Sequence, residues 1–197
     1  IIYNTYKAKT KQIIEEDIYK LIYDIIDINF KKIDQIALNM GIEKDSLIRI
    51  KASLIYIMTE VSNTYGHSYY FYEELTSLLP RVLGVTITTE LFDQALIELQ
   101  KDIKIVVKEE KFYLKDMYDA ETLIVKRLRL LEKNPITTSK HIDDKIKDLE
   151  DFYGIIYNDE QKQAIKESYE KDILIITGGP GTGKTTIMKG ITELYRQ

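Results

Sequence analysis

Apolar residues recur at the three- and four-residue spacing of amphipathic helices along most of this chain. Within residues 1–44 two short patterns of this kind flank Asp27-Ile28-Asn29, and Gly41 ends the second. Two short helices joined by a tight turn, with Lys31 and Lys32 just after it, predict a helix-hairpin-helix-like module. Such a module presents backbone N–H groups of its turn to a DNA phosphate, although any αα-hairpin gives a similar pattern.

Residues 45–118 show helices followed by a β-hairpin, which predicts a winged-helix-like module. The expected elements are helices at 46–65, 72–83 and 89–101, then strands at 103–107 and 111–114 around a tight turn. This kind of module binds nucleic acid in some proteins and packs against protein in others. The helix at 89–101 is as acidic as it is basic, which argues against base reading in the major groove, where Arg, Lys, Asn and Gln are needed.

A connecting segment of helices is predicted over residues 119–150. Its first helical stripe runs from Ala120 to Lys133 and is broken by Asn134-Pro135 and by Thr137-Thr138-Ser139, the strongest linker signal in the chain. Another amphipathic helix follows, with Ile142, Ile146 and Leu149 on one face. Asn158 is then a good N-cap for a further helix that carries Gln161 on its first turn.

The chemistry of the chain is concentrated in residues 173–186. An apolar stretch, Ile173–Ile176, predicts a strand that leads into Gly178-Gly179-Pro180-Gly181-Thr182-Gly183-Lys184-Thr185-Thr186, and a helix is expected from about Thr185 to Arg196. Glycines let the backbone form a concave nest of N–H groups for phosphates, and the helix N-terminus adds partial positive charge. Lys184 would reach the terminal phosphates, and the Thr185 hydroxyl would hold Mg²⁺. The pattern predicts a nucleotide-binding loop.

The loop lies close to the end of the sequence, whereas the strand that carries the metal-binding carboxylate normally comes later. The chain is therefore expected to be the N-terminal part of a protein, cut after the first motif of its motor domain. Glu109-Glu110, after the apolar residues 103–107, resembles such a carboxylate pair. Because Phe112-Tyr113-Leu114 follows at once, the pair is better interpreted as a hairpin turn.

Composition narrows the classes of function. The 197 residues carry 28 basic and 32 acidic side chains, for a net charge of −4. The charge of the chain as a whole therefore does not indicate nucleic-acid binding. There is no cysteine, which excludes disulfides and Cys-based zinc sites, and there is no long apolar run or signal pattern. His67 and His141 are far apart and are interpreted as loop or surface residues. A reduced, cytoplasmic compartment fits these features. The local basic clusters are Lys7, Lys9 and Lys11; Lys31 and Lys32; and Lys126, Arg127, Arg129 and Lys133.

Two stretches, Tyr157–Ile165 and Ile176–Ile187, resemble the start of a superfamily 1 helicase motor. The Gly-Gly-Pro-Gly-Thr-Gly-Lys-Thr-Thr version is similar to the RecD-like helicases, the family of the exodeoxyribonuclease V alpha subunit. In that family the glutamine that corresponds to Gln161 recognises adenine, whose amino group and ring nitrogen suit a side-chain amide.

Upstream, residues 28–37 resemble the helix-hairpin-helix motif of the RecD-like proteins that work without RecB and RecC. Two later segments, Gly66-His67-Ser68-Tyr69 and Ala120-Glu121, are similar to later motifs of the same proteins. Asp27 and Asn29 stand where the family usually has glycines, and a Cβ at these positions hinders close approach to a phosphate.

The resemblance implies a mainly α fold with a small β component. Helix-hairpin-helix and winged-helix-like modules would precede the first strand, loop and helix of a RecA-like P-loop α/β domain, at residues 151–197. It also implies an ATP-dependent 5′-to-3′ DNA helicase of recombination or repair. ATP and Mg²⁺ would be its cofactors, and single-stranded DNA or DNA with a 5′ overhang its partner.

The implied ATP-binding residues are Gln161, Gly178, Gly179, Pro180, Gly181, Thr182, Gly183, Lys184, Thr185 and Thr186, with Lys184 catalytic and Thr185 on Mg²⁺. Without the later carboxylates and arginine fingers, this chain alone is expected to be inactive. The alternative is that the N-terminal pieces are a protein-interaction or DNA-docking module of another P-loop ATPase, with no catalysis in this chain.

Overall fold

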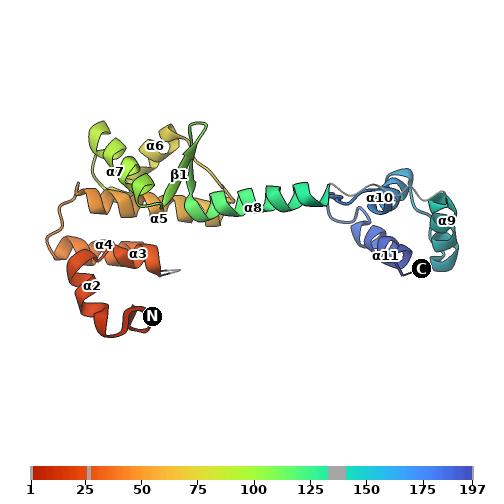
Figure 1. The fold of residues 1–197 in the computed structure, drawn as a ribbon, viewed down its shortest axis with the longest axis horizontal. Helices are drawn as coiled ribbons and strands as arrows, with labels where there is room; N and C mark the ends of the chain where they lie inside the picture. The colour runs from red at the N-terminus through yellow and green to blue at the C-terminus, as the bar shows by residue number, and fades with distance from the viewer. Residues whose placement is uncertain (1, 26–27, 133–140, 197) are drawn as a thin grey trace. The chain divides into compact units, whose positions relative to one another are not determined.

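A computed structural model describes residues 2–25, 28–132 and 141–196, and these divide into two compact units, residues 1–121 and 122–197 (Figure 1). The finer division into 1–44, 45–118, 119–150 and 151–197 stays a prediction. In the described ranges, every helix is too short or too polar to cross a membrane.

The first unit begins with short helices. They are α1 (Ile2–Tyr6), a 3₁₀ turn η1 (Lys7–Lys9), α2 (Thr10–Asp17), α3 (Lys20–Asp24) and α4 (Phe30–Asn39). The single helix predicted before the break is thus divided after Asp17, where the Asp17 carboxylate accepts the backbone N–H of Tyr19 at 2.9 Å and competes with helical bonding. The predicted break at Ile28-Asn29 is confirmed, and Asp27 lies outside the described residues.

Three longer helices follow α4 in the first unit. They are α5 (Leu47–Tyr65), α6 (Tyr72–Leu83) and α7 (Thr89–Lys101), and α6 and α7 both pack on α5 (Figure 1). The αL residues Gly66 and Gly84 end α5 and α6, as expected for helix C-termini. The larger core of the unit includes Ile50, Leu54, Met58, Leu75, Leu79, Phe92 and Leu99.

The predicted hairpin is confirmed. Strands β1 (Ile105–Lys108) and β2 (Lys111–Leu114) pair antiparallel, and Tyr70 adds an isolated bridge to Phe112. Glu109 and Glu110 have φ of 52° and 61°, the left-handed pair that a two-residue hairpin turn requires. These two carboxylates therefore belong to a turn.

Helix α8 (Lys115–Leu131) follows β2 directly and begins five residues before the predicted start at Ala120. Its first turn is stabilised by an ion pair between Lys115 and Asp119. The predicted linker signals Asn134-Pro135 and Thr137-Thr138-Ser139 lie outside the described residues.

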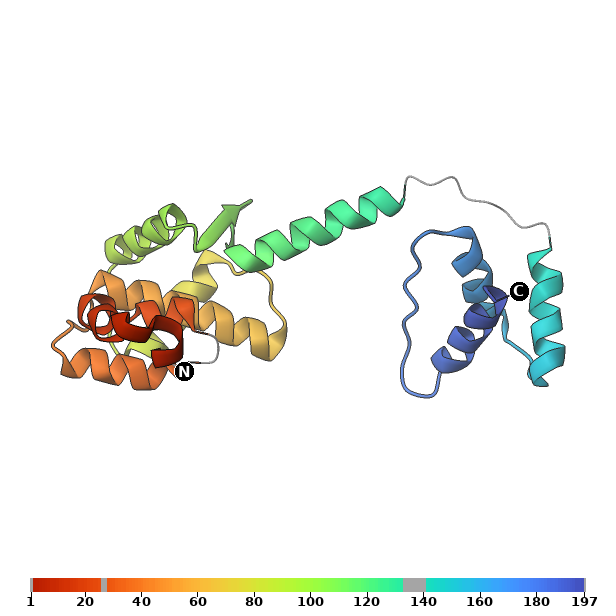
Figure 2. The ribbon, with the colours of Figure 1, turned by 60° about the horizontal axis from the view of Figure 1, so that its bottom comes forward.

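The second unit contains α9 (Ile142–Tyr153), α10 (Asp159–Glu170) and α11 (Lys184–Leu194) around a small core (Figure 2). The three apolar residues predicted for α9 are all buried in that core, whose members are Ile142, Ile146, Leu149, Tyr157, Ile165, Ile187 and Leu194. Glu150 links α9 to α10 because it accepts the Tyr157 N–H at 2.8 Å and pairs with Lys162 at 3.0 Å. The hydrogen bond from Lys162 lowers the pKa of Glu150.

The strand predicted at Ile173–Ile176 is not formed. This stretch belongs to the long segment between α10 and α11 (Figure 2), and Ile175 is 81% exposed. The two strands of the described residues pair with each other in the first unit, so Ile173–Ile176 has no strand beside it. An extended stretch without a neighbour cannot form a ladder, which accounts for the difference.

Candidate phosphate-binding loop and base-recognition residue

The loop predicted to bind phosphate has the backbone that its glycines allow. Gly181 and Gly183 have φ of 80° and 82°, which side-chain-bearing residues rarely adopt. A Cβ on Gly178 would lie 2.6 Å from the Thr182 hydroxyl, which itself donates to the Gly179 carbonyl at 2.9 Å. Backbone conformation thus favours glycine at positions 181 and 183, and the space beside Thr182 favours it at position 178.

Lys184 is folded back over this loop. Its ammonium group donates to the carbonyls of Gly178 and Gly179, at 2.6 Å each, with the Thr182 hydroxyl at 3.4 Å. The loop's own oxygens therefore hold a positive charge at its concave side. Phosphate oxygens are stronger, charged acceptors, so a bound triphosphate can take over these bonds.

Lys184 is also the first residue of α11, and Thr185 and Thr186 follow in its first turn. The first N–H groups of a helix lack intrahelical acceptors and, with the helix dipole, attract anions. Thr185 is exposed, so its hydroxyl is accessible to a metal ion. Within the residues that the structure describes, no group of three or more His, Asp or Glu side chains could hold a metal ion.

Gln161 lies beside the loop and belongs to a reciprocal cap at the start of α10. The Asn158 side-chain oxygen accepts the Gln161 N–H at 2.8 Å, and Gln161 Oε1 accepts the Asn158 N–H at 3.1 Å. The other end of the Gln161 amide faces the loop, since a Cβ on Gly183 would lie 2.4 Å from Nε2. The predicted base-recognition residue and the loop are therefore neighbours.

The two elements share one hollow of about 400 Å³ in the second unit. Its walls combine polar and apolar groups from α10, from the segment before the loop and from α11. They include Asn158, Gln161, Leu174, Ile176, Gly178, Thr182, Lys184 and Ile187. Polar donors at one place over an apolar lining suit a nucleotide, which has a charged tail and a flat base.

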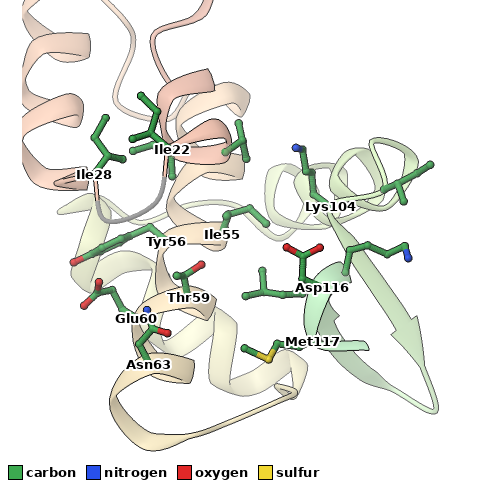
Figure 3. A pocket seen from close by; sticks show the side chains of 15 residues that line it. Ile22, Ile28, Ile55, Tyr56, Thr59, Glu60, Asn63, Lys104, Asp116 and Met117 are labelled. Atoms are coloured by element: carbon green, nitrogen blue, oxygen red, sulfur yellow. The ribbon is translucent and has the colours of Figure 1, made fainter. Parts of the chain in front are cut away.

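The first unit has a hollow of similar size, about 410 Å³, beside α5 (Figure 3). Ile22, Ile28 and Tyr56 lie on one side of it, while Lys104, Asp116 and Met117 lie on the other. No residue predicted to bind nucleotide lines this hollow. The two histidines are exposed, as predicted, and neither lines either hollow.

The predicted DNA-facing turn is partly occupied by its own side chain. Asn29 caps α4 and accepts the Lys32 N–H at 3.0 Å, so this donor is already bonded. The side chains of Lys31 and Lys32 are exposed. Their charge remains accessible although one backbone donor of the turn is used.

The spacing Asn158-x-x-Gln161 is a capping-box signature that could have predicted the bond from the Asn158 N–H to Gln161. From the sequence, only the N-cap role of Asn158 was predicted. The close packing around Gly190 was not predicted; a Cβ there would lie 2.7 Å from the Tyr157 hydroxyl and 3.0 Å from Ile165 Cδ1. No short sequence motif indicates this contact.

Two family models match this chain, one near each end. Residues 1–69 match the family described as the ATP-dependent RecD2 DNA helicase HHH domain, and residues 161–197 match an AAA domain. The RecBCD enzyme subunit RecD of Buchnera aphidicola subsp. Schizaphis graminum (strain Sg) is 38% identical over 86 residues, which are 43% of this chain and 14% of that protein. The resemblance to RecD-like helicases, and the fold class expected from it, are confirmed.

Proposed function

We propose that this chain, which resembles RecD-like helicases, provides the DNA-facing N-terminal modules and the first ATP-binding elements of a DNA helicase. The activity would be ATP-dependent 5′-to-3′ unwinding in recombination or repair, on single-stranded DNA or DNA with a 5′ overhang. The similarity to RecD supports this proposal, and the matched segment is only 14% of that relative's length. The motor chemistry would therefore need elements beyond those described.

The observation that carries the proposal is the position of Lys184. Its ammonium lies 2.6 Å from two loop carbonyls, and both Lys184 and Gln161 line the same hollow. We assign Lys184 to the transferring phosphate, whose negative charge it would neutralise, and this stabilisation is where such enzymes gain most of their rate.

The other roles that we propose are those that the loop motif and the resemblance to RecD-like helicases imply. Residues 178–183 would cradle the phosphates with the backbone N–H groups of all but Pro180, which has none, and Thr186 would add its own from the first turn of α11. Thr185 would place its hydroxyl on Mg²⁺, and Gln161 would contact adenine. Bound Mg²⁺–ATP would supply the phosphoryl bond whose hydrolysis drives movement.

The proposal is tested by unwinding assays on a helicase polypeptide that contains this chain. We expect ATP-dependent opening of a duplex with a 5′ overhang and none with a 3′ overhang. Lys184→Ala should lower ATP hydrolysis by about 100-fold or more, whereas Lys189→Ala, an exposed lysine on the same helix, should not. Equal turnover by the Lys184→Ala protein, with an unchanged fold, would exclude the assignment.

A second candidate is favoured by the acidic side chains of α7. Glu98 and Asp102 both pair with Lys51 of α5, at 3.2 and 2.6 Å, so they serve packing within the first unit. Together with the occupied turn at Asn29, this supports a protein-interaction or DNA-docking module of another P-loop ATPase. A salt titration of DNA binding separates a DNA-binding module from a protein-interaction module, because phosphate contacts make DNA affinity fall steeply with salt. No DNA binding at low salt would favour protein interaction.

A further inference from the structure

We propose that the backbone N–H of Asn158 is a positioning group that fixes which end of the Gln161 amide faces the nucleotide. The inference rests on the proposed adenine contact of Gln161 and deepens it. Asn158 would give the site its discrimination between adenine and guanine without touching the base.

The orientation of the amide follows from the chemistry of the cap. A backbone N–H can only donate, so the Gln161 atom that lies 3.1 Å from the Asn158 nitrogen must be the oxygen. The amino end is then directed away from the cap, toward Gly183 of the phosphate loop. Turning the amide over would place two donors against each other at Asn158, which is unfavourable.

A fixed amide discriminates bases better than a free one. Adenine presents an amino donor beside a ring acceptor, whereas guanine presents a carbonyl acceptor at the position of that amino group. Gln161 Oε1 has a second lone pair, which suits the adenine amino group and repels the guanine carbonyl. An amide that could turn over would offer its amino end to guanine, so the restraint is itself a specificity device.

The chain offers substitutions that separate the two halves of the cap. Asn158 has φ of −72°, which proline adopts, so Asn158→Pro removes the N–H donor and the side-chain acceptor together. Asn158→Ala removes the side-chain acceptor and keeps the N–H. A role in helix capping alone predicts the same nucleotide preference for both variants, whereas the positioning role predicts a difference.

The first measurement needs no nucleotide. In the 197-residue chain, nitrogen-15 relaxation of the Gln161 side-chain amide reports its order. We expect an ordered amide in the unmodified chain and in Asn158→Ala, and a disordered one in Asn158→Pro. Equal order in the two variants, each with helix α10 intact by its backbone signals, would overturn the proposal.

The second measurement is the ratio of ATP to GTP affinity, obtained by NMR titration of the same chains. Asn158→Ala should weaken both nucleotides by a similar factor, and Asn158→Pro should lower the ratio by about three- to tenfold, the value of one neutral hydrogen bond. Gln161→Ala removes both ends of the side-chain amide, and it should also lower the ratio.

The last variant distinguishes two failures. If Gln161→Ala leaves the ratio unchanged, the adenine contact itself is wrong, and the proposed site fails with it. If Gln161→Ala lowers the ratio while Asn158→Pro matches Asn158→Ala, the contact stands and the positioning role is refuted.

Discussion

Arg49 and Asp34 form a bidentate ion pair inside the first unit, with Nε and Nη2 of the arginine at 2.7 and 2.9 Å from the two carboxylate oxygens. The side chains are 3% and 12% exposed. Arg49 also donates to the carbonyls of Lys44 and Leu83, and the Tyr19 hydroxyl donates to Asp34 at 2.6 Å. This network joins α4, α5 and the end of α6, so the helix-hairpin-helix segment is tied to the helices that follow.

Removing one partner of this pair should strongly destabilise the first unit. Arg49→Met leaves a buried carboxylate with one remaining donor, and such a loss costs about 3–5 kcal/mol. The control is Lys11→Met, which breaks an exposed pair with Glu15 worth at most about 0.5 kcal/mol. Urea unfolding, followed through the backbone signals of α4 and α5, measures both. Equal stabilities for the two variants would contradict the role of the network.

The same pair predicts a pH dependence of stability. Burial alone would raise the pKa of Asp34, but hydrogen bonds from Arg49 and Tyr19 outweigh it and hold that pKa below its ordinary value of 3.8. Between that value and the lower pKa of the folded state, the unfolded chain binds the proton and the folded chain does not. The stabilisation is therefore complete above about pH 4 and is lost as the pH falls through the folded pKa.

We expect the free energy of unfolding of the first unit to decrease on acidification below about pH 4. Asp34→Asn should flatten this decrease, since the amide does not titrate. Unfolding curves from pH 5 to pH 2, read on the α4 and α5 signals, check the result. A variant with the same slope as the parent chain would show that other carboxylates cause the loss.

The packing of α11 predicts an unusual pair of substitutions. A Cβ on Gly190 would lie 2.7 Å from the Tyr157 hydroxyl, and Tyr157 is packed in the core of the second unit, where it is only 2% exposed. Gly190→Ala should therefore cost about 1–3 kcal/mol by overpacking, although alanine favours the helix by about 1 kcal/mol.

Tyr157→Phe should relieve this clash. The Tyr157 hydroxyl is buried and has no hydrogen-bond partner among the described residues, so its removal alone should be neutral or stabilising. We expect the double variant to be more stable than Gly190→Ala. A double variant that is no more stable would place the cost elsewhere, and thermal unfolding of the second unit measures the difference.

Much of the fold could be predicted because the sequence marks its own boundaries. Helices α6 and α7 begin and end where predicted, since Gly84 takes the left-handed conformation and Thr88 caps α7. The hairpin turn could also be predicted, because its sequence signal lies in the turn and in the strands beside it. The break after Asp17 was missed because it depends on one side chain that bonds the backbone two residues on.

The other differences between prediction and structure come from interactions that the spacing of apolar residues does not reveal. Ile173–Ile176 has the composition of a strand, but pairing depends on a neighbour that lies elsewhere in sequence. In the candidate site, the motif identified the loop and Gln161, while the mutual bond of Asn158 and Gln161 and the position of Nε2 beside Gly183 required coordinates. Residue types predict the chemistry, and their orientation requires the structure.

We propose that residues 178–186 bind a nucleoside triphosphate through Lys184. Titration of the 197-residue chain with Mg²⁺–ATP, observed on the backbone signals of the loop and α11, tests this binding. We expect saturable shifts centred on residues 178–186 and Gln161. Affinity should fall by about 10- to 100-fold in Lys184→Ala, the value of its charged hydrogen bonds, and stay unchanged in Lys189→Ala. Equal binding by Lys184→Ala and the parent chain, or shifts confined to other residues, would contradict it.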